Sequence, residues 1–276
     1  MDCGLDQLFS MIDGDEVRIV PSCGHFAGSQ GELFDDEREG LFSGLEEADF
    51  NIIAGLFSPR GFGLKLPENA RRLFELSVNA FDAVIQAWMS ELPVTGEIVR
   101  FGRKVLAAAD AAVFPNPRCP GEAESAQRRA AERAAGDSGD PVVRAVLEAA
   151  YKVSHEVDRL RGLLRFCPDG DGVYIARCEP DHFILPALGP HFKERFGQTS
   201  WVIIDEKRRL CLRCTEGRYL KLSGTGQTVS AQKSAAGEWE NLWRHYHKTI
   251  NNESRNNPGL QKKFMPKRYW KYLTEL

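Results

Sequence analysis

The chain of 276 residues contains no run of about 18 apolar residues, so the sequence predicts no membrane-spanning helix. It begins MDCGLDQLFSMIDGDE, with acidic residues where a secretory signal carries a basic segment followed by an apolar one. We therefore expect a cytoplasmic protein with no membrane partner.

Cysteine is too sparse and too irregularly placed for a disulfide framework, because the seven cysteines are odd in number and unevenly spaced. Cys211 and Cys214, in CLRC, form half of a zinc-ribbon pattern, but no second pair has the matching spacing. If this stretch is a strand, residues three apart face opposite sides of the sheet. We expect no disulfide and no metal site.

The common nucleotide-binding and hydrolase motifs are missing as well. The sequence has no Gly-x-Gly-x-x-Gly loop after a strand, no Walker loop and no Gly-x-Ser-x-Gly elbow. It also lacks the Cys-x3-Cys-x2-Cys cluster of radical-SAM enzymes. We expect no cofactor, and no catalytic motif identifies the chain as an enzyme.

What the sequence does contain is an ordinary globular composition with segregated charge. Residues 1–50 carry 13 acidic and 2 basic residues, residues 51–140 carry 11 of each, and residues 141–276 carry 15 acidic and 23 basic. This asymmetry predicts a basic surface that meets an anion. Alternatively, the folded chain intermixes these charges into an ordinary solvated surface.

Apolar periodicity predicts helices in the first half of the chain. Helical spacing runs through 67–90, a second helix starts with Thr95 as its cap and ends near Val113, and Asp140 and Pro141 open the clearest helix. Strands are predicted at 172–180, 200–206, 209–215 and 218–224, with a helix between the first two and another near 238–250. The fold class is therefore α+β, with a helical N-terminal half and then a small antiparallel or mixed sheet flanked by helices.

Composition divides the chain into four segments. Residues 1–50 are acidic and lack a core of their own, and residues 51–114 are helical. Residues 115–140 hold three prolines and three glycines but no large apolar residue, which predicts a flexible insertion. Residues 141–276 form an α+β core domain with a basic C-terminal segment.

The stretch QKKFMPKRYWKYL, residues 261–273, combines cations with aromatic residues. A short helix from Pro266 would turn Trp270 and Leu273 inward and leave the cations outside, and we also expect Phe264 in the core. Exposed cations can bind nucleic-acid phosphates, although a solvated charged face is the alternative. The candidate phosphate contacts are Arg255, Lys262, Lys263, Lys267, Arg268 and Lys271.

Two histidines are candidates for acid or base chemistry. His182 and His191 lie between the first two long predicted strands, and Glu179 and Asp181 are close to His182 in sequence. Catalysis would require these four side chains to converge in a cleft. A capping or core role for the histidines is the alternative.

Several stretches carry a resemblance to a known family: RLRGLLRF, GVYIARCEPDHFILPALGPHFKERF, WVIIDEKR and RNNPGLQKKFMPKRYWKYLTEL. They resemble an uncharacterised bacterial family described as DNA metabolism or DNA repair proteins, whose C-terminal portion is a domain of unknown function. The resemblance covers most of 141–276 and, more weakly, 50–113. The stretch 115–140 looks inserted relative to that family.

The resemblance implies a partner. Such proteins are typically encoded beside a radical-SAM protein with helix-hairpin-helix DNA-binding elements, and related domains are fused to uracil-DNA-glycosylase-like domains. We therefore expect a DNA-binding accessory partner of a radical-SAM DNA-modifying enzyme. The alternatives are an enzyme acting on a modified or damaged base or nucleotide, and a protein-interaction scaffold without direct DNA contact.

Overall fold

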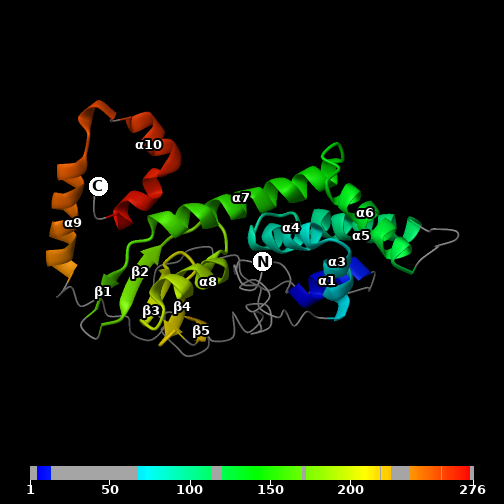
Figure 1. The fold of residues 1–276 in the computed structure, drawn as a ribbon, viewed down its shortest axis with the longest axis horizontal. Helices are drawn as coiled ribbons and strands as arrows, with labels where there is room; N and C mark the ends of the chain where they lie inside the picture. The colour runs from blue at the N-terminus through cyan, green and yellow to red at the C-terminus, as the bar shows by residue number, and fades with distance from the viewer. Residues whose placement is uncertain are drawn as a thin grey trace, which may run out of the picture. The chain divides into compact units, whose positions relative to one another are not determined.

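The computed structural model describes residues 5–13, 68–112, 120–169, 172–217, 219–224, 236–255 and 257–273. In these ranges the chain divides into two units inside helix α7 (Pro141–Leu163), between Ser154 and His155. Helices make up the first unit, and a mixed sheet with helices makes up the second (Figure 1). The predicted α+β class is confirmed. Most of the acidic segment 1–50 lies outside the described residues.

The first unit contains α1 (Leu5–Asp13), α3 (Glu68–Leu76), α4 (Val78–Met89), α5 (Thr95–Ala111), α6 (Pro120–Ala135) and the start of α7. The single helix predicted over 67–90 is two helices, because the extended backbone of Ser77 interrupts it. The Ser77 side chain then caps α4 by accepting a hydrogen bond from the Ala80 amide. Thr95 is the first residue of α5 and not its cap; that position belongs to Val94.

Aromatic packing holds the first unit together. Phe9 of α1 stacks on Phe81 of α4 with ring centroids 5.4 Å apart. Helix α1 also approaches α5 closely at Gly102, where an added Cβ would lie 2.7 Å from a side-chain carbon of Ile12. The buried apolar residues of α1 are therefore part of this helical core.

The prediction of a flexible insertion at 115–140 is wrong for most of its length, since residues 120–135 form α6 and pack against α5. Burial here does not need large side chains, because alanines let two helix backbones approach closely. Residues 113–119 lie outside the described ranges. The buried residues of α6 are Ala126, Ala130, Ala131 and Ala135.

Helix α7 begins as predicted. The Asp140 carboxylate accepts hydrogen bonds from the amides of Val142 (2.7 Å) and Val143 (3.2 Å), and Pro141 occupies the first helical position. Lys104 of α5 forms an ion pair with the same carboxylate at 2.7 Å. The lysine holds the pKa of Asp140 below its usual range, as do the capping amides.

The sheet of the second unit has five strands in the described residues, in the order β1 (Cys167–Pro168), β2 (Tyr174–Cys178), β3 (Trp201–Asp205), β4 (Leu210–Thr215) and β5 (Tyr219–Gly224). β2 and β3 are parallel and joined through α8 (Leu185–Phe196), whereas the other neighbours are antiparallel. The four predicted strands are present. The two-residue β1 was not anticipated, since so short a strand has no periodicity.

The two faces of the sheet bury different residues. On one face Trp201 packs near Phe192 of α8, with ring centroids 6.3 Å apart. Val202 and Ile204 pack on the other face, together with Cys211. Cys211 pairs with Ile204 and Cys214 pairs with Trp201, so the two thiols lie on opposite faces as predicted.

The C-terminal segment forms α9 (Ala236–Ile250), the 3-10 turn η2 (Glu253–Arg255), α10 (Pro258–Phe264) and the 3-10 helix η3 (Lys267–Tyr272). Helix α10 begins after Asn257, whose side chain caps it by accepting a hydrogen bond from the Leu260 amide at 3.0 Å. No helix in the described ranges is long and apolar enough to cross a membrane.

Candidate functional site

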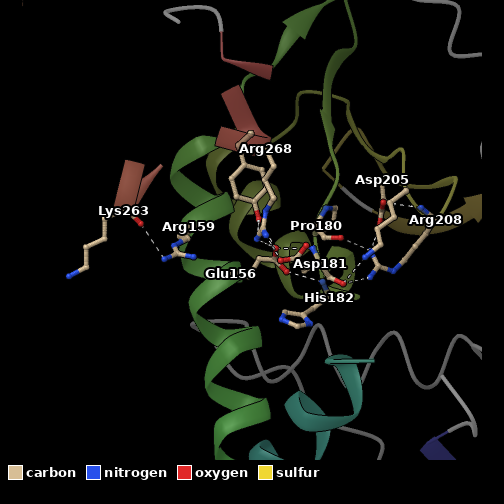
Figure 2. Close-up of polar contacts among 11 residues, drawn as sticks. Glu156, Arg159, Pro180, Asp181, His182, Asp205, Arg208, Lys263 and Arg268 are labelled. Carbon is tan, nitrogen blue, oxygen red and sulfur yellow. Dashed lines mark hydrogen bonds and ion pairs between the residues drawn. The ribbon is translucent and has the colours of Figure 1, made fainter. Parts of the chain in front are cut away.

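The loop between β2 and α8, residues 179–182 (EPDH), is held by a carboxylate from α7. Glu156 is buried, with 3% of its surface exposed, and its two oxygens accept the backbone amides of Asp181 and His182, each at 2.9 Å. Figure 2 shows this carboxylate facing the loop. A buried carboxylate needs such donors, because removing its charge from water without partners costs on the order of several kcal/mol.

The C-terminal 3-10 helix supplies the other donors to Glu156. The Tyr269 hydroxyl donates a 2.5 Å hydrogen bond to the carboxylate, and the Arg268 guanidinium donates one of 3.0 Å. Arg268 also forms an ion pair with Asp181 and donates to the Tyr269 oxygen at 2.8 Å. Burial and the neighbouring carboxylate raise the pKa of Tyr269 well above its ordinary value, so the hydroxyl stays a donor.

A second set of contacts joins η3 to the sheet. Lys271 forms an ion pair with Glu179 at 2.7 Å, and the Tyr272 hydroxyl donates to Glu206 at 2.6 Å. Arg177 of β2 pairs with the other oxygen of Glu206 at 3.2 Å. The Tyr272 hydrogen bond lowers the pKa of Glu206, and Arg177 lowers it further.

The carbonyl groups of the same loop are also bound. Arg208 donates to the Pro180 carbonyl at 3.0 Å and to the Asp181 carbonyl at 2.8 Å, while forming an ion pair with the buried Asp205 at 2.8 Å (Figure 2). Burial raises the pKa of Asp205, and the arginine opposes that shift. The loop is therefore fixed from both sides, and its polar groups serve to dock the C-terminal segment.

The four candidate catalytic residues are placed in different surroundings. Glu179 and Asp181 pair with Lys271 and Arg268 of η3. The backbone amide of His182 donates a hydrogen bond to Glu156, and the His182 imidazole extends away from that carboxylate in Figure 2. His191 lies on α8, with its Nε2 buried and without a hydrogen-bond partner.

The environment of His191 disfavours its charged form. Burial lowers the pKa of His191, and the positive charges of Arg161 and Arg195 lower it further, whereas Glu194 raises it. A cavity in the described residues lies instead in the first unit, lined in part by Trp88, Leu92 and Ile98. No candidate catalytic residue lines that cavity.

The six candidate phosphate contacts fall into two groups. Arg268 and Lys271 have carboxylate partners within the protein. The other four are exposed and form no ion pair with another described residue. Arg159 of α7 adds a cation beside this group, because its guanidinium lies 3.5 Å from the Lys263 carbonyl (Figure 2). The exposed four are Arg255, Lys262, Lys263 and Lys267.

The aromatic residues of the C-terminal segment are only partly as predicted. Leu273 is buried and Trp270 is half-buried, with its indole N–H bound to the Met265 carbonyl at 2.8 Å. Phe264 is 57% exposed, so its prediction as a core residue is wrong. Tyr269 is the buried anchor that the sequence interpretation missed.

The described residues contain no group of three or more histidine, cysteine, aspartate or glutamate side chains arranged to hold a metal ion. The site as a whole is a polar junction, buried at Glu156 and Tyr269, in which carboxylates of α7, the EPDH loop and the β3–β4 turn bind donors of η3. Such an arrangement stabilises and positions the C-terminal segment.

A comparison with protein families gives one match. The model of a family described as a domain of unknown function, DUF4130, matches residues 125–275, more than half of the chain. The chain belongs to the DUF4130 family. The DUF4130 region includes both ends of the junction, Glu156 and Tyr269. No curated protein and no solved structure matches the chain.

Membership of the DUF4130 family confirms the resemblance at its coarser level, a domain of unknown function at the C-terminal side. The role in DNA repair and the radical-SAM partner stay predictions from the resemblance.

Proposed function

We propose that this protein is a DNA-binding accessory protein that contacts the phosphate backbone through the exposed cations of its C-terminal segment. The contacts would come from Arg255, Lys262, Lys263 and Lys267. Phosphate contacts position a protein without reading bases, so the proposal includes little or no sequence specificity.

The observation that supports this proposal is how charge is distributed between the segment and the core. Residues 241–273 contain eight lysines and arginines but a single acidic residue, Glu253. The nearby carboxylates of Glu156, Glu179 and Asp181 are occupied by Arg268, Lys271 and Tyr269. The four exposed cations thus keep their charge for a polyanion, and counterion release on phosphate binding would drive association.

The junction gives this proposal a structural basis as well. If the basic segment folded only on binding DNA, the entropy cost of ordering it would reduce the affinity for DNA. Here the buried Tyr269 and the ion pair of Arg268 fix η3 to the domain before any ligand arrives. A fixed segment presents the preceding cations at less entropic cost on binding.

The proposed partner is a radical-SAM DNA-modifying enzyme, and its support is the family resemblance. The chain itself lacks the Cys-x3-Cys-x2-Cys cluster motif, so the radical chemistry would belong to the partner. Co-expression of the two proteins, with a tag on this chain alone, tests the association. Recovery of the radical-SAM protein only in the presence of DNA would indicate that the two proteins share DNA without forming a complex.

Fluorescence anisotropy of a labelled duplex, titrated with the protein at several salt concentrations, tests the DNA proposal itself. Binding should weaken linearly on a log–log plot as salt rises. Undetectable or salt-independent binding would reject direct phosphate contact. Complex formation with the partner in the absence of DNA binding would then favour the scaffold alternative.

A further inference from the structure

Helix α9 presents large apolar side chains to solvent. Among its described side chains, Leu242 and Ile250 are each 57% exposed, Tyr246 is 51% exposed and Trp243 is 40% exposed. They recur at the helical spacing expected for one face. Apolar side chains that gather on one exposed helix face make that face a candidate binding site for another molecule.

Two rings on this exposed face are in contact with each other. The Trp243 and Tyr246 rings lie one turn apart, with centroids separated by 5.6 Å and planes inclined by 32°. Helix α10 also has an exposed ring, Phe264, and the Lys263 Nζ lies 6.0 Å from the centroid of that ring. Both helices therefore combine exposed rings with positive charge in the same segment.

Charge indicates which kind of molecule fits. A neutral apolar protein surface covering α9 and α10 would offer no negative charge to the exposed cations Lys262 and Lys263, and the sequence of residues 241–273 itself contains a single acidic residue, Glu253. Single-stranded DNA offers flat apolar bases and a negative backbone together. In a duplex the base faces are stacked on one another and are unavailable to a ring.

We propose that α9 and α10 form a binding surface for single-stranded DNA, in which Trp243, Tyr246 and Phe264 stack on bases while Lys262 and Lys263 contact phosphates. This inference rests on the proposed DNA-binding function and adds the form of DNA that is bound. The protein should prefer a single strand over a duplex of the same length, and should tolerate any base sequence, because every base has a π-face.

The test uses a labelled dT oligonucleotide of roughly 15 nucleotides, close to the upper site size of single-strand binding folds. The variant W243L/Y246L keeps the helix face apolar and removes the rings, whereas W243F/Y246F keeps the rings. The leucine variant should bind the oligonucleotide at least about fivefold more weakly, the lower bound for losing one stacked base, and the phenylalanine variant should stay near wild type. Tyr151→Leu, at a 67% exposed tyrosine of α7, is the matched control and should have no effect.

The outcomes separate this inference from the proposed function. If K262E/K263E weakens binding but W243L/Y246L does not, DNA binding stands and the stacking surface is wrong. If neither variant changes affinity, both fail. If W243L/Y246L binds DNA like wild type, and W243D/Y246D converts a self-associated wild type into a monomer by light scattering, the face is an interface between copies of the chain. Circular dichroism of each variant checks that α9 is still helical.

Discussion

The Tyr269 hydroxyl donates a 2.5 Å hydrogen bond to the Glu156 carboxylate, a residue 113 positions earlier in the chain. The carboxylate also accepts two backbone amides of the EPDH loop and the Arg268 guanidinium. One buried acid thus joins α7, the loop after β2 and the C-terminal 3-10 helix. Its removal should affect all three elements together.

Tyr269→Phe should lower the free energy of unfolding by about 1.5–3 kcal/mol, because it keeps the ring but removes the hydrogen bond to the Glu156 carboxylate and the one accepted from Arg268. Glu156→Gln should cost more, about 2–4 kcal/mol, since a neutral amide cannot satisfy the same donors and leaves Arg268 without its buried partner. Urea denaturation followed by circular dichroism measures both. A loss for Glu156→Gln no larger than that for Tyr269→Phe would contradict the central role of this carboxylate.

Lys271→Ala should lower the free energy of unfolding less than Glu156→Gln does. Its ion pair with Glu179 has side chains 52% and 39% exposed, so water screens the interaction. Exposed pairs contribute about 1 kcal/mol at most, and high salt reduces that further. A loss near that of Glu156→Gln would show that the exposed pair, and not the buried acid, holds the C-terminal segment.

DNA binding should depend on salt in proportion to the number of exposed cations. On duplex DNA each phosphate contact contributes about −0.9 to the slope of the logarithm of the binding constant against the logarithm of salt concentration, so four contacts give about −3.6. K262E/K263E removes two contacts and should reduce the slope to about −1.8. The matched control is R128E/R129E on α6, two exposed arginines of the first unit, which should leave the slope unchanged.

Stability should fall in acid in a way that depends on His191. Burial and two arginines hold the pKa of His191 below its ordinary value of 6.5, so the unfolded chain binds a proton more readily than the folded one. The contribution of His191 to the free energy of unfolding is therefore fully present above about pH 6.5 and is lost as the pH falls toward the lower pKa of the folded state. Urea unfolding of wild type and His191→Gln at several pH values between about 5 and 8 measures it. The variant should lose less stability in this window, and parallel curves would exclude the linkage.

Gly217→Ala should destabilise the β4–β5 hairpin. Gly217 has a φ of +67°, and an added Cβ would collide with the backbone carbonyl of Gly197. Neither the left-handed backbone nor a clash with main chain can be relieved by rotating a side chain, so the loss should be about 2–4 kcal/mol. Gly121→Ala, in α6 with open space around the position, is the matched control and should not destabilise. Equal stability of the two variants would mean that the hairpin turn can rearrange.

Local chemistry made much of the fold predictable from sequence. The cap of Asp140, the strands from Tyr174 to Gly224 and the opposite facing of Cys211 and Cys214 all depend on a few neighbouring residues. The prediction failed where long-range packing decides. Helix α6 packs against α5, and its sequence has no periodicity of large apolar residues that would predict this contact.

The same distinction applies to the site. The sequence determined that the C-terminal segment is basic and aromatic and that EPDH is a polar loop after a strand, because both properties belong to contiguous residues. Only the tertiary structure decided which cations are neutralised: Arg268 and Lys271 meet carboxylates, whereas Lys262, Lys263 and Lys267 are left exposed. Charge pairing depends on distances of a few ångströms between residues far apart in the chain, and a one-dimensional pattern contains no such distances.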